Sequence, residues 1–315
     1  MFKKIKRILD LSRNLLYYKD KIRPILNRNN IELEYFYKRD QMMQYAINTQ
    51  TMGVTTDRIL PSDLIVSLTS YGDRLKYAAL SIESIMQGTM KPNKIVLSIS
   101  EEHKESLPIL LKKQQQRGLE ILFCKDIRSY TKLIPVLRKY PEAFVITIDD
   151  DCIYNQDLVE NLVNASINNP NEICANRVHR ITFNDNGNIK KYNEWKHGSN
   201  IEDASYLNFL TGVGGVLYPP HSLFDKVTDE TTFLDICPYA DDVWFFAMAV
   251  KKGTLIRKIN TYNKNGDEFV WNPSHNEGLN NINVLLNAND IQIQKVFEKY
   301  DIMSKIKTAS HLKVV

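Results

Sequence analysis

Between residues 63 and 155, four short apolar segments alternate with segments of helical periodicity. The apolar segments have the length of β-strands and lie at residues 64–69, 94–100, 119–123 and 143–148. The segments between them place apolar residues on one helical face and lie at residues 77–86, 107–116 and 132–138. Strand–helix units of about 30 residues connect parallel strands through right-handed crossovers. Residues 63–155 are therefore predicted to form a Rossmann-like half of an α/β domain.

The second half of the chain has a looser pattern. It contains a predicted helix at residues 158–167, a turn sequence at 184–188, an apolar stretch at 209–220 and a second predicted helix at 242–251. With 315 residues, 43% of them hydrophobic and 25% charged, one principal core is the simplest arrangement. We expect an N-terminal helical segment at 1–60, the main domain at 61–285 and a helical tail at 286–315.

Positive charge is concentrated at the N-terminus. Residues 1–28 hold nine Lys and Arg residues against Asp10 and Asp20, so this segment carries +7 and the net charge of +4 leaves −3 for the rest. A uniformly basic groove for nucleic acid is not indicated. Apolar residues recur between the basic ones at roughly helical spacing, which is typical of a helix that lies on an anionic membrane surface. A helix packed on the protein's own body has the same periodicity, and both alternatives stay open.

The four cysteines, Cys124, Cys152, Cys174 and Cys237, form no C-x-x-C pair and are predicted to be reduced core residues. The sequence has no run of about 18 apolar residues and no signal-peptide pattern. We therefore expect a cytoplasmic protein that does not span a membrane, with possible peripheral contact to the inner face of the cell membrane through residues 1–28.

Three adjacent carboxylates, Asp149, Asp150 and Asp151, follow directly after the apolar segment 143–148. Ligands bind beyond the carboxyl ends of strands in parallel α/β sheets, so a site is expected here. Because adjacent carboxylates repel one another, a divalent cation would stabilise them. Mg²⁺ and Mn²⁺ prefer such oxygen ligands together with substrate phosphates. In an extended stretch Asp149 and Asp151 point the same way and could share one ion. A solvated acidic turn is the alternative.

The strand followed by Asp-x-Asp resembles the metal and diphosphate site of GT-A glycosyltransferases, most closely the bacterial cell-surface polysaccharide enzymes related to family 2. The resemblance covers about residues 63–280 and implies that Asp149 and Asp150 contribute to donor binding and that Asp149 and Asp151 hold Mn²⁺ or Mg²⁺. The segment at 66–74 resembles the first strand and its loop, which hold the base and ribose. The resemblance assigns donor binding to Thr69, Ser70, Tyr71 and Arg74. An ordinary strand-to-helix turn remains the alternative.

Further pieces of this resemblance follow in the same order. The segment around Lys132 resembles the one that supplies a helix near the donor phosphates, where the lysine would neutralise phosphate charge. The glycine-rich segment 212–215 lacks the spacing of a dinucleotide fingerprint. The resemblance places Gly214 and Gly215 below the transferred sugar, where the absence of side chains lets donor and acceptor approach. A tight turn or a β-bulge would also require these glycines.

Asp241 and Asp242 precede a helical segment and resemble the acidic pair that provides the catalytic base in inverting enzymes of this type. The family usually has Glu-Asp, which leaves the base open between the two; we favour Asp242, with Asp241 orienting the acceptor. Helix capping explains an Asp at this position equally well. His275 lies in a polar loop and resembles the C-terminal histidine that some branches return to the metal.

These features predict a metal-dependent, inverting glycosyltransferase. Its donor is expected to be a nucleotide sugar, with UDP the commonest nucleotide for such enzymes, and its acceptor a saccharide or a lipid-linked saccharide in bacterial surface polysaccharide synthesis. A Mg²⁺-dependent phosphotransferase or phosphatase and a catalytically inactive scaffold that binds nucleotide sugars are the alternatives. Haloacid-dehalogenase-like enzymes, however, place their Asp-x-Asp after the first strand, whereas here it follows the fourth.

Overall fold

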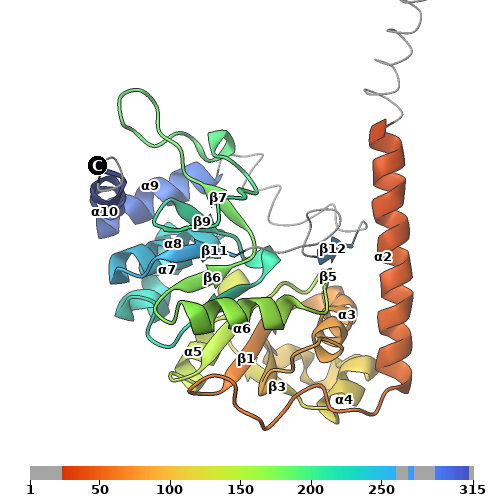
Figure 1. Ribbon diagram of the computed structural model, residues 1–315. Helices are drawn as coiled ribbons and strands as arrows, with labels where there is room; N and C mark the ends of the chain where they lie inside the picture. Colours follow the sequence, from red (N-terminus) through yellow and green to blue (C-terminus); the bar gives the residue numbers. More distant parts are fainter. Residues whose placement is uncertain (1–22, 260–268, 273–287, 312–315) are drawn as a thin grey trace, which may run out of the picture.

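The computed structural model describes residues 23–259, 269–272 and 288–311. The strands of its main sheet are β1 (Leu64–Thr69), β2 (Lys94–Ser100), β3 (Leu119–Cys124), β4 (Phe144–Thr147), β6 (Ile173–Ala175), β8 (Ala204–Ser205), β10 (Val216–Tyr218) and β11 (Ile256–Lys258). These eight strands lie in the order β3-β2-β1-β4-β10-β6-β11-β8 (Figure 1). Two small two-stranded sheets pair β5 (Cys152–Tyr154) with β12 (Phe269–Trp271), and β7 (Val178–Arg180) with β9 (Asn208–Leu210).

The first four strands of the main sheet are parallel to one another. β1 lies between β2 and β4, and β3 is paired with β2. β10 then runs antiparallel to both β4 and β6. Strand order therefore reverses between β1 and β4, which makes the space beyond their carboxyl ends the topological switch point of the sheet.

Helices cover both faces of the sheet, so its strands are apolar on both sides. One face packs against α3 (Leu75–Met86), α4 (Ile109–Gln115) and α6 (Leu158–Asn168). The other packs against α5 (Ile134–Lys139), α8 (Asp241–Lys252), α9 (Ala288–Tyr300) and α10 (Ile302–His311). Along β1, Ile65 faces the second group whereas Val66 and Leu68 face the first. This alternation explains why the strand is buried almost throughout.

The predicted fold class is confirmed: a Rossmann-like sheet with further strands on one side is preceded by a helical N-terminal segment. The remaining helix of the second half is α7 (Glu230–Ile236), and short 3-10 turns are η2 (Gly72–Arg74), η3 (Glu101–Ser106), η4 (Arg128–Lys132), η5 (Tyr192–Glu194), η6 (Gly212–Gly214) and η7 (Asp225–Thr228). The helix predicted at 132–138 starts at Ile134 instead, because residues 128–132 form η4. The predicted turn at 184–188 is present, with Gly187 at a φ of 72°.

Helix α2 (Arg23–Asn48) stands along one side of the molecule, and its N-terminal part extends beyond the body (Figure 1). Tyr35 and Met42 pack against Leu80 of α3 and Ile153 of β5. Leu33 and Tyr37 are 66% and 72% exposed. Residues 1–22 of the basic segment at 1–28 lie outside the described residues. Contact of this segment with a membrane, or with the protein's own body, therefore stays a prediction.

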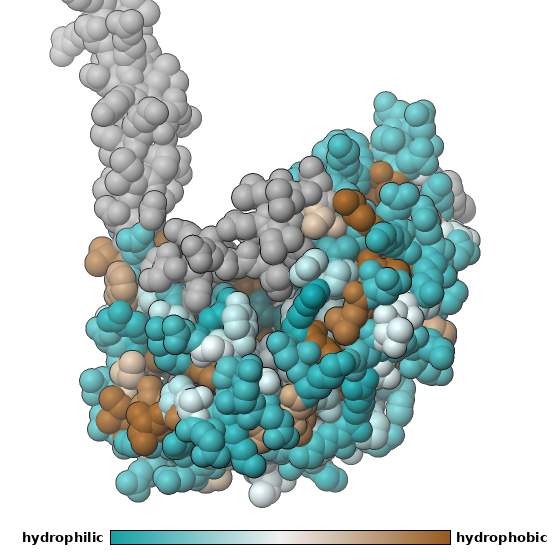
Figure 2. Space-filling view, turned by 180° about the vertical axis from the view of Figure 1, so that it is seen from behind, coloured by the Kyte–Doolittle hydropathy of each residue, from teal (hydrophilic) through white to brown (hydrophobic). Residues whose placement is uncertain are grey.

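Hydrophilic side chains cover most of the face shown in Figure 2, and hydrophobic ones occur in small separate groups. Within the described ranges, no helix combines the length and the apolar character needed to cross a membrane. All four cysteines are free thiols, and Cys152, Cys174 and Cys237 are buried as predicted for core residues.

Candidate functional site

The predicted donor-binding and metal-binding aspartates lie at the switch point of the sheet. Asp149, Asp150 and Asp151 follow β4, and Ser70 and Arg74 follow the adjacent β1. The Asp150 carboxylate accepts hydrogen bonds from Ser70 Oγ at 2.6 Å and Arg74 Nε at 3.1 Å. Arg74 Nη2 also lies 3.1 Å from Asp151 Oδ2. Two loops far apart in the sequence are thus held together by charge-assisted hydrogen bonds.

Asp149 faces a different cation from its two neighbours. Lys132 Nζ donates to Asp149 Oδ1 at 2.6 Å and lies 3.3 Å from Asp241 Oδ2. The side-by-side arrangement expected for Asp149 and Asp151 in an extended chain is not seen, because residues 150–151 form a turn and Asp151 shares Arg74 with Asp150.

Lys132 is buried at the end of η4 and is fixed from its backbone. Ser67 Oγ in β1 donates to the Lys132 carbonyl oxygen at 2.5 Å. Burial by itself lowers the pKa of Lys132, but the carboxylates of Asp149, Asp241 and Asp242 together raise it well above its usual value. The lysine therefore stays charged and links the end of β4 to the start of α8.

Asp241 and Asp242 form the first turn of α8, but neither caps it. The residue that precedes the helix is Ala240, which makes no side-chain cap, so capping does not explain the pair. Asp242 Oδ1 instead accepts a hydrogen bond from the Gly212 backbone at 3.0 Å. Burial and the Asp241 carboxylate raise the pKa of Asp242 to about 8, against the opposing effect of Lys132. This pKa lies near the operating pH, as is required of a general acid–base group, and the group accepts a proton in its ionised form.

The glycine-rich turn lies directly over these charged groups. A Cβ atom on Gly212 would come within 3.1 Å of Asp242 Oδ1 and 3.2 Å of Lys132 Nζ. Gly214 and Gly215, the predicted sugar-contacting glycines, pack instead against Arg177 and Leu158. Gly212 is therefore the residue of this turn at which a side chain would crowd Asp242 and Lys132.

Tyr154, which the sequence reasoning missed, joins the aspartate turn to the glycine turn. Its hydroxyl accepts from the Asp149 backbone N–H at 2.8 Å and donates to the Val213 carbonyl at 3.0 Å. Tyr154 is buried in β5, as is Cys152 two residues earlier on the same face of the strand. Nothing in the sequence indicated the partner in residues 212–215.

The remaining predicted donor residues have varied surroundings. Thr69 Oγ1 donates to the Ser98 carbonyl at 2.8 Å and ties the end of β1 to β2. Tyr71 is 61% exposed, and the Arg74 guanidinium lies 5.6 Å from its ring centroid, so one ring face is available for stacking. His275 lies outside the described residues, and its role as a metal ligand stays a prediction.

The predicted metal site fits the charge of this region. Five carboxylates, those of Asp149, Asp150, Asp151, Asp241 and Asp242, face two cations, Lys132 and Arg74. Burial raises the pKa of Asp151, and Asp149 and Asp150 raise it further, against the opposing effect of Arg74. In the described part of the chain, no group of three or more His, Cys, Asp or Glu side chains is arranged to hold a metal ion. Mg²⁺ is often held by one or two carboxylates together with substrate phosphates, and the role of Asp149 and Asp151 as metal ligands stays a prediction.

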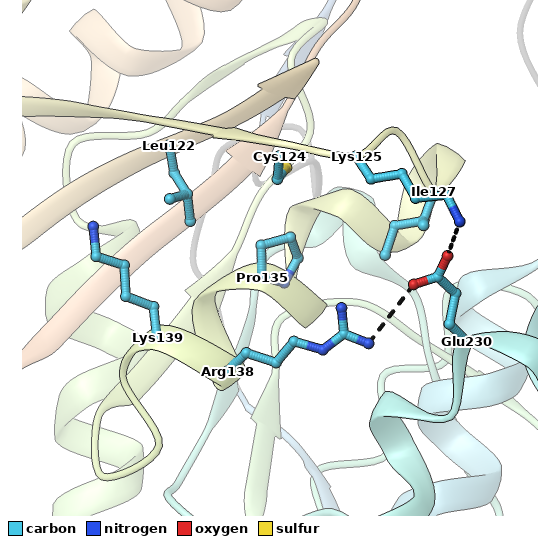
Figure 3. A pocket seen from close by; sticks show the side chains of 8 residues that line it. All are labelled: Leu122, Cys124, Lys125, Ile127, Pro135, Arg138, Lys139 and Glu230. Carbon is cyan, nitrogen blue, oxygen red and sulfur yellow. Dashed lines mark hydrogen bonds and ion pairs between the residues drawn. The ribbon is translucent and has the colours of Figure 1, made fainter. Parts of the chain in front are cut away.

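A pocket of about 310 Å³ at the β3 edge of the sheet is separate from this site (Figure 3). Glu230 points between Lys125 and Arg138 and forms an ion pair with each. Lys139, which also lines the pocket, pairs with Glu120. Since these cations already have carboxylate partners, the pocket offers no free charge for a ligand.

Comparison with known proteins gives distant similarities only. No family model matches the sequence, and neither does any of the curated proteins compared with it. A crystal structure of S. aureus TarS 1-349 has a TM-score of 0.42 at 13% identity and covers 66% of this chain and 60% of that one.

Two solved synthetases are similar at the same level. CMP:2-keto-3-deoxy-manno-octonic acid synthetase complexed with CTP has a TM-score of 0.37 at 13% identity and covers 62% of this chain and 89% of that one. The 4-diphosphocytidyl-2C-methyl-D-erythritol synthase of Anaerococcus prevotii DSM 20548 has a TM-score of 0.36 at 10% identity, with coverages of 55% and 77%. These similarities are too distant to assign a ligand or a reaction. The chemistry has to be inferred from the chain's own residues.

Proposed function

We propose that this protein is a metal-dependent glycosyltransferase in bacterial surface polysaccharide synthesis. It moves a sugar from a nucleotide sugar to a saccharide or lipid-linked acceptor, and we expect the donor to be a UDP-sugar. The observation that carries the proposal is the position of Asp242. Its carboxylate lies against Gly212, and the Gly212 backbone borders Lys132 and Asp149 as well. A candidate base and the charged groups of a candidate diphosphate site therefore meet at Gly212, at the switch point of the sheet.

The reaction follows from these positions. Asp242 takes the proton from the acceptor hydroxyl, and the hydroxyl oxygen attacks the anomeric carbon of the donor sugar. The bond from that carbon to the diphosphate breaks, and the nucleoside diphosphate leaves with the electron pair. Attack opposite to the leaving group inverts the anomeric configuration. Lys132 is placed to stabilise the negative charge that develops on the departing phosphate.

Two further features support the donor assignment. Asp149 and Asp151 would hold Mn²⁺ or Mg²⁺, which as a Lewis acid would add positive charge beside the donor phosphates. Ser70 and Arg74 hold Asp150 and so fix the loop after β1, where the exposed ring of Tyr71 offers a surface for a nucleotide base. Asp241, held beside Lys132, is better placed to orient that lysine than to bind the acceptor directly.

We also propose that the protein works at the cytoplasmic face of the cell membrane, with residues 1–28 in contact with anionic lipid. The support is the charge of that segment, +7 against −3 for the remainder of the chain. A lipid-linked acceptor would be presented at the same surface.

The direct test measures release of the free nucleotide, UDP, GDP or CMP, from a panel of UDP-, GDP- and CMP-activated sugars with a membrane extract as acceptor source, in Mn²⁺, Mg²⁺ or EDTA. We expect release from at least one nucleotide sugar and its loss in EDTA. Turnover of phosphate monoesters but of no sugar nucleotide would favour the phosphotransferase alternative. Tight donor binding without any turnover would favour the scaffold.

A further inference from the structure

Arg177, in the loop between β6 and β7, differs in its charge partners from the other buried and half-buried arginines that the structure describes. The buried and half-buried arginines elsewhere in the described ranges each pair with a carboxylate. They are Arg39, Arg74, Arg117, Arg180 and Arg257. Arg177 is half-buried too, but over residues 23–259, 269–272 and 288–311 its guanidinium has no carboxylate partner. A partly desolvated charge is costly unless an opposite charge offsets it, so this position is suited to an anionic ligand.

The position of Arg177 is fixed relative to the candidate base. Arg177 Nη1 donates to Thr211 Oγ1 at 3.2 Å, and Thr211 Oγ1 in turn donates to the Arg177 carbonyl at 3.1 Å. Thr211 immediately precedes Gly212, whose backbone N–H donates to Asp242 Oδ1. Gly214 lets the two loops approach, since a Cβ there would lie 2.6 Å from Arg177 Cβ. Arg177 is thus linked to Asp242 through the adjacent residues Thr211 and Gly212, each of which makes one of the two hydrogen bonds.

Tyr192, at the start of η5, is close enough to the same two groups for their charges to act on it. The Asp242 carboxylate raises the pKa of Tyr192 beyond the effect of burial, while the Arg177 charge lowers it, so both charges lie within electrostatic reach of the hydroxyl. The ring is half-buried and is supported from the side by His197, whose ring centroid lies 5.2 Å away. The ring also packs against Trp195 and Phe209, whose centroids lie 5.1 and 5.9 Å away, so Tyr192 belongs to an aromatic cluster.

Arg177 and the donor-side groups approach different residues of the glycine-rich turn. Lys132 and Asp149 contact the turn at Gly212, and Arg177 contacts it at Thr211 and Gly214. We propose that Arg177 forms an anion-binding subsite for the acceptor, which is therefore a saccharide bearing a phosphate or carboxylate group near the hydroxyl that is glycosylated. This inference rests on the proposed transferase function and adds the chemical class of its acceptor.

The test measures binding, with UDP and Mn²⁺ present so that the donor site is filled. Glucose 6-phosphate and glucuronate are compared with glucose as probes, for the wild type, Arg177→Gln, Arg177→Lys and the surface control Arg58→Gln. We expect the wild type to prefer the charged probes by about tenfold or more, as for a charge-assisted hydrogen bond. Arg177→Gln should abolish this preference, Arg177→Lys should retain part of it, and Arg58→Gln should match the wild type.

The subsite is wrong if the wild type shows no preference for the charged probes, or if Arg177→Gln keeps that preference. A second arm compares UDP-glucuronate with UDP-glucose. Loss of discrimination between these donors in Arg177→Gln, with the phosphosugar preference intact, would assign the charge to the donor sugar and overturn the acceptor subsite. All of these experiments measure binding, so they test the subsite independently of turnover. An absence of turnover would contradict the proposed function but not the subsite.

Discussion

Asp241 and Asp242 are adjacent in the sequence, yet their surroundings differ. Asp241 is buried at 7% exposure beside Lys132, whereas Asp242 is half-buried and meets the backbone of Gly212. A base has to reach the acceptor, which favours Asp242. The sequence already favoured Asp242 as the base, with Asp241 orienting the acceptor; the structure adds the different partners of the two carboxylates.

Asp151→Ala should abolish Mn²⁺-dependent donor binding while the protein stays folded. Removing its carboxylate breaks the ion pair with Arg74 but relieves repulsion from Asp149 and Asp150, and Arg74 keeps Asp150 as a partner. Calorimetric titration of a UDP-sugar with and without Mn²⁺ measures the effect. The exposed Asp185→Ala is the matched control, and normal metal-dependent binding by Asp151→Ala would place the metal elsewhere.

His179 makes stability depend on pH. It is 2% exposed, and its Nδ1 accepts a hydrogen bond from the Gly198 N–H at 3.1 Å, which requires the neutral ring. Burial, then the charges of Arg177 and His197, lowers its pKa to about 3 from 6.5. The unfolded chain takes up the proton first as pH falls, so this contribution is complete above about pH 6.5 and is lost toward pH 3.

Denaturant unfolding of the wild type and His179→Gln between pH 7.5 and 5 measures this effect, since the amide oxygen of Gln can accept the same hydrogen bond without titrating. The wild type should lose about 2 kcal/mol relative to the variant over that interval. A difference that stays constant with pH would mean that His179 titrates normally.

At the scale of elements, the turn η6 contacts the candidate base at Gly212. Gly212→Ala would press its methyl group on the flexible ends of Asp242 and Lys132, which can move aside. We expect turnover to fall about tenfold or more because small displacements of catalytic groups are costly, with little change in stability.

Gly214→Ala is the informative contrast, since its Cβ would meet the Arg177 backbone nitrogen at 3.0 Å and force the backbone to shift. Its main effect should be a loss of about 1–3 kcal/mol in the free energy of unfolding. Steady-state kinetics and urea unfolding of both variants separate the two effects. Equal loss of stability in both would contradict the different surroundings of the two glycines.

The elements themselves were largely predictable. Strand β1 was predicted at its observed bounds, since an uninterrupted apolar run between polar turns has few alternatives. The start of α5 was not, because η4 ends on a lysine that pairs with Asp149 and Asp241 instead of opening a helix. Local periodicity contains no information on such long-range pairing.

At the scale of the whole molecule, parallel topology explains why the site was partly predictable. Segments after β1 and β4 meet because those strands are neighbours, so Ser70, Arg74 and the aspartates could be expected together. The contributions of Arg177 and Tyr154 depend on how the second half folds back. The buried ion pair of Glu83 with Arg117, at 0% and 3% exposure, likewise joins two separate segments and has no sequence signature.

Deleting residues 1–28 should release the protein from anionic liposomes without abolishing donor turnover. The expected cause is loss of the +7 charge of this segment, to which each Lys or Arg near the surface contributes about 1 kcal/mol. Sedimentation with phosphatidylserine vesicles, and with neutral vesicles as the control, measures the effect. Unchanged liposome binding would assign the segment to the protein's own body.

The central claim is that Asp242 activates the acceptor beside a donor held by Lys132 and the aspartates after β4. Asp242→Asn tests it most directly, because Asn keeps the shape and can still accept from Gly212 but cannot take up the acceptor proton. Turnover and donor affinity are measured on the same preparation, with Asp241→Asn as the neighbouring control. We predict that Asp242→Asn lowers kcat by about 10²-fold or more with donor affinity nearly unchanged, and that Asp241→Asn is milder. Near-normal kcat in Asp242→Asn would contradict the proposed base, and near-normal kcat in both variants would contradict the inverting mechanism.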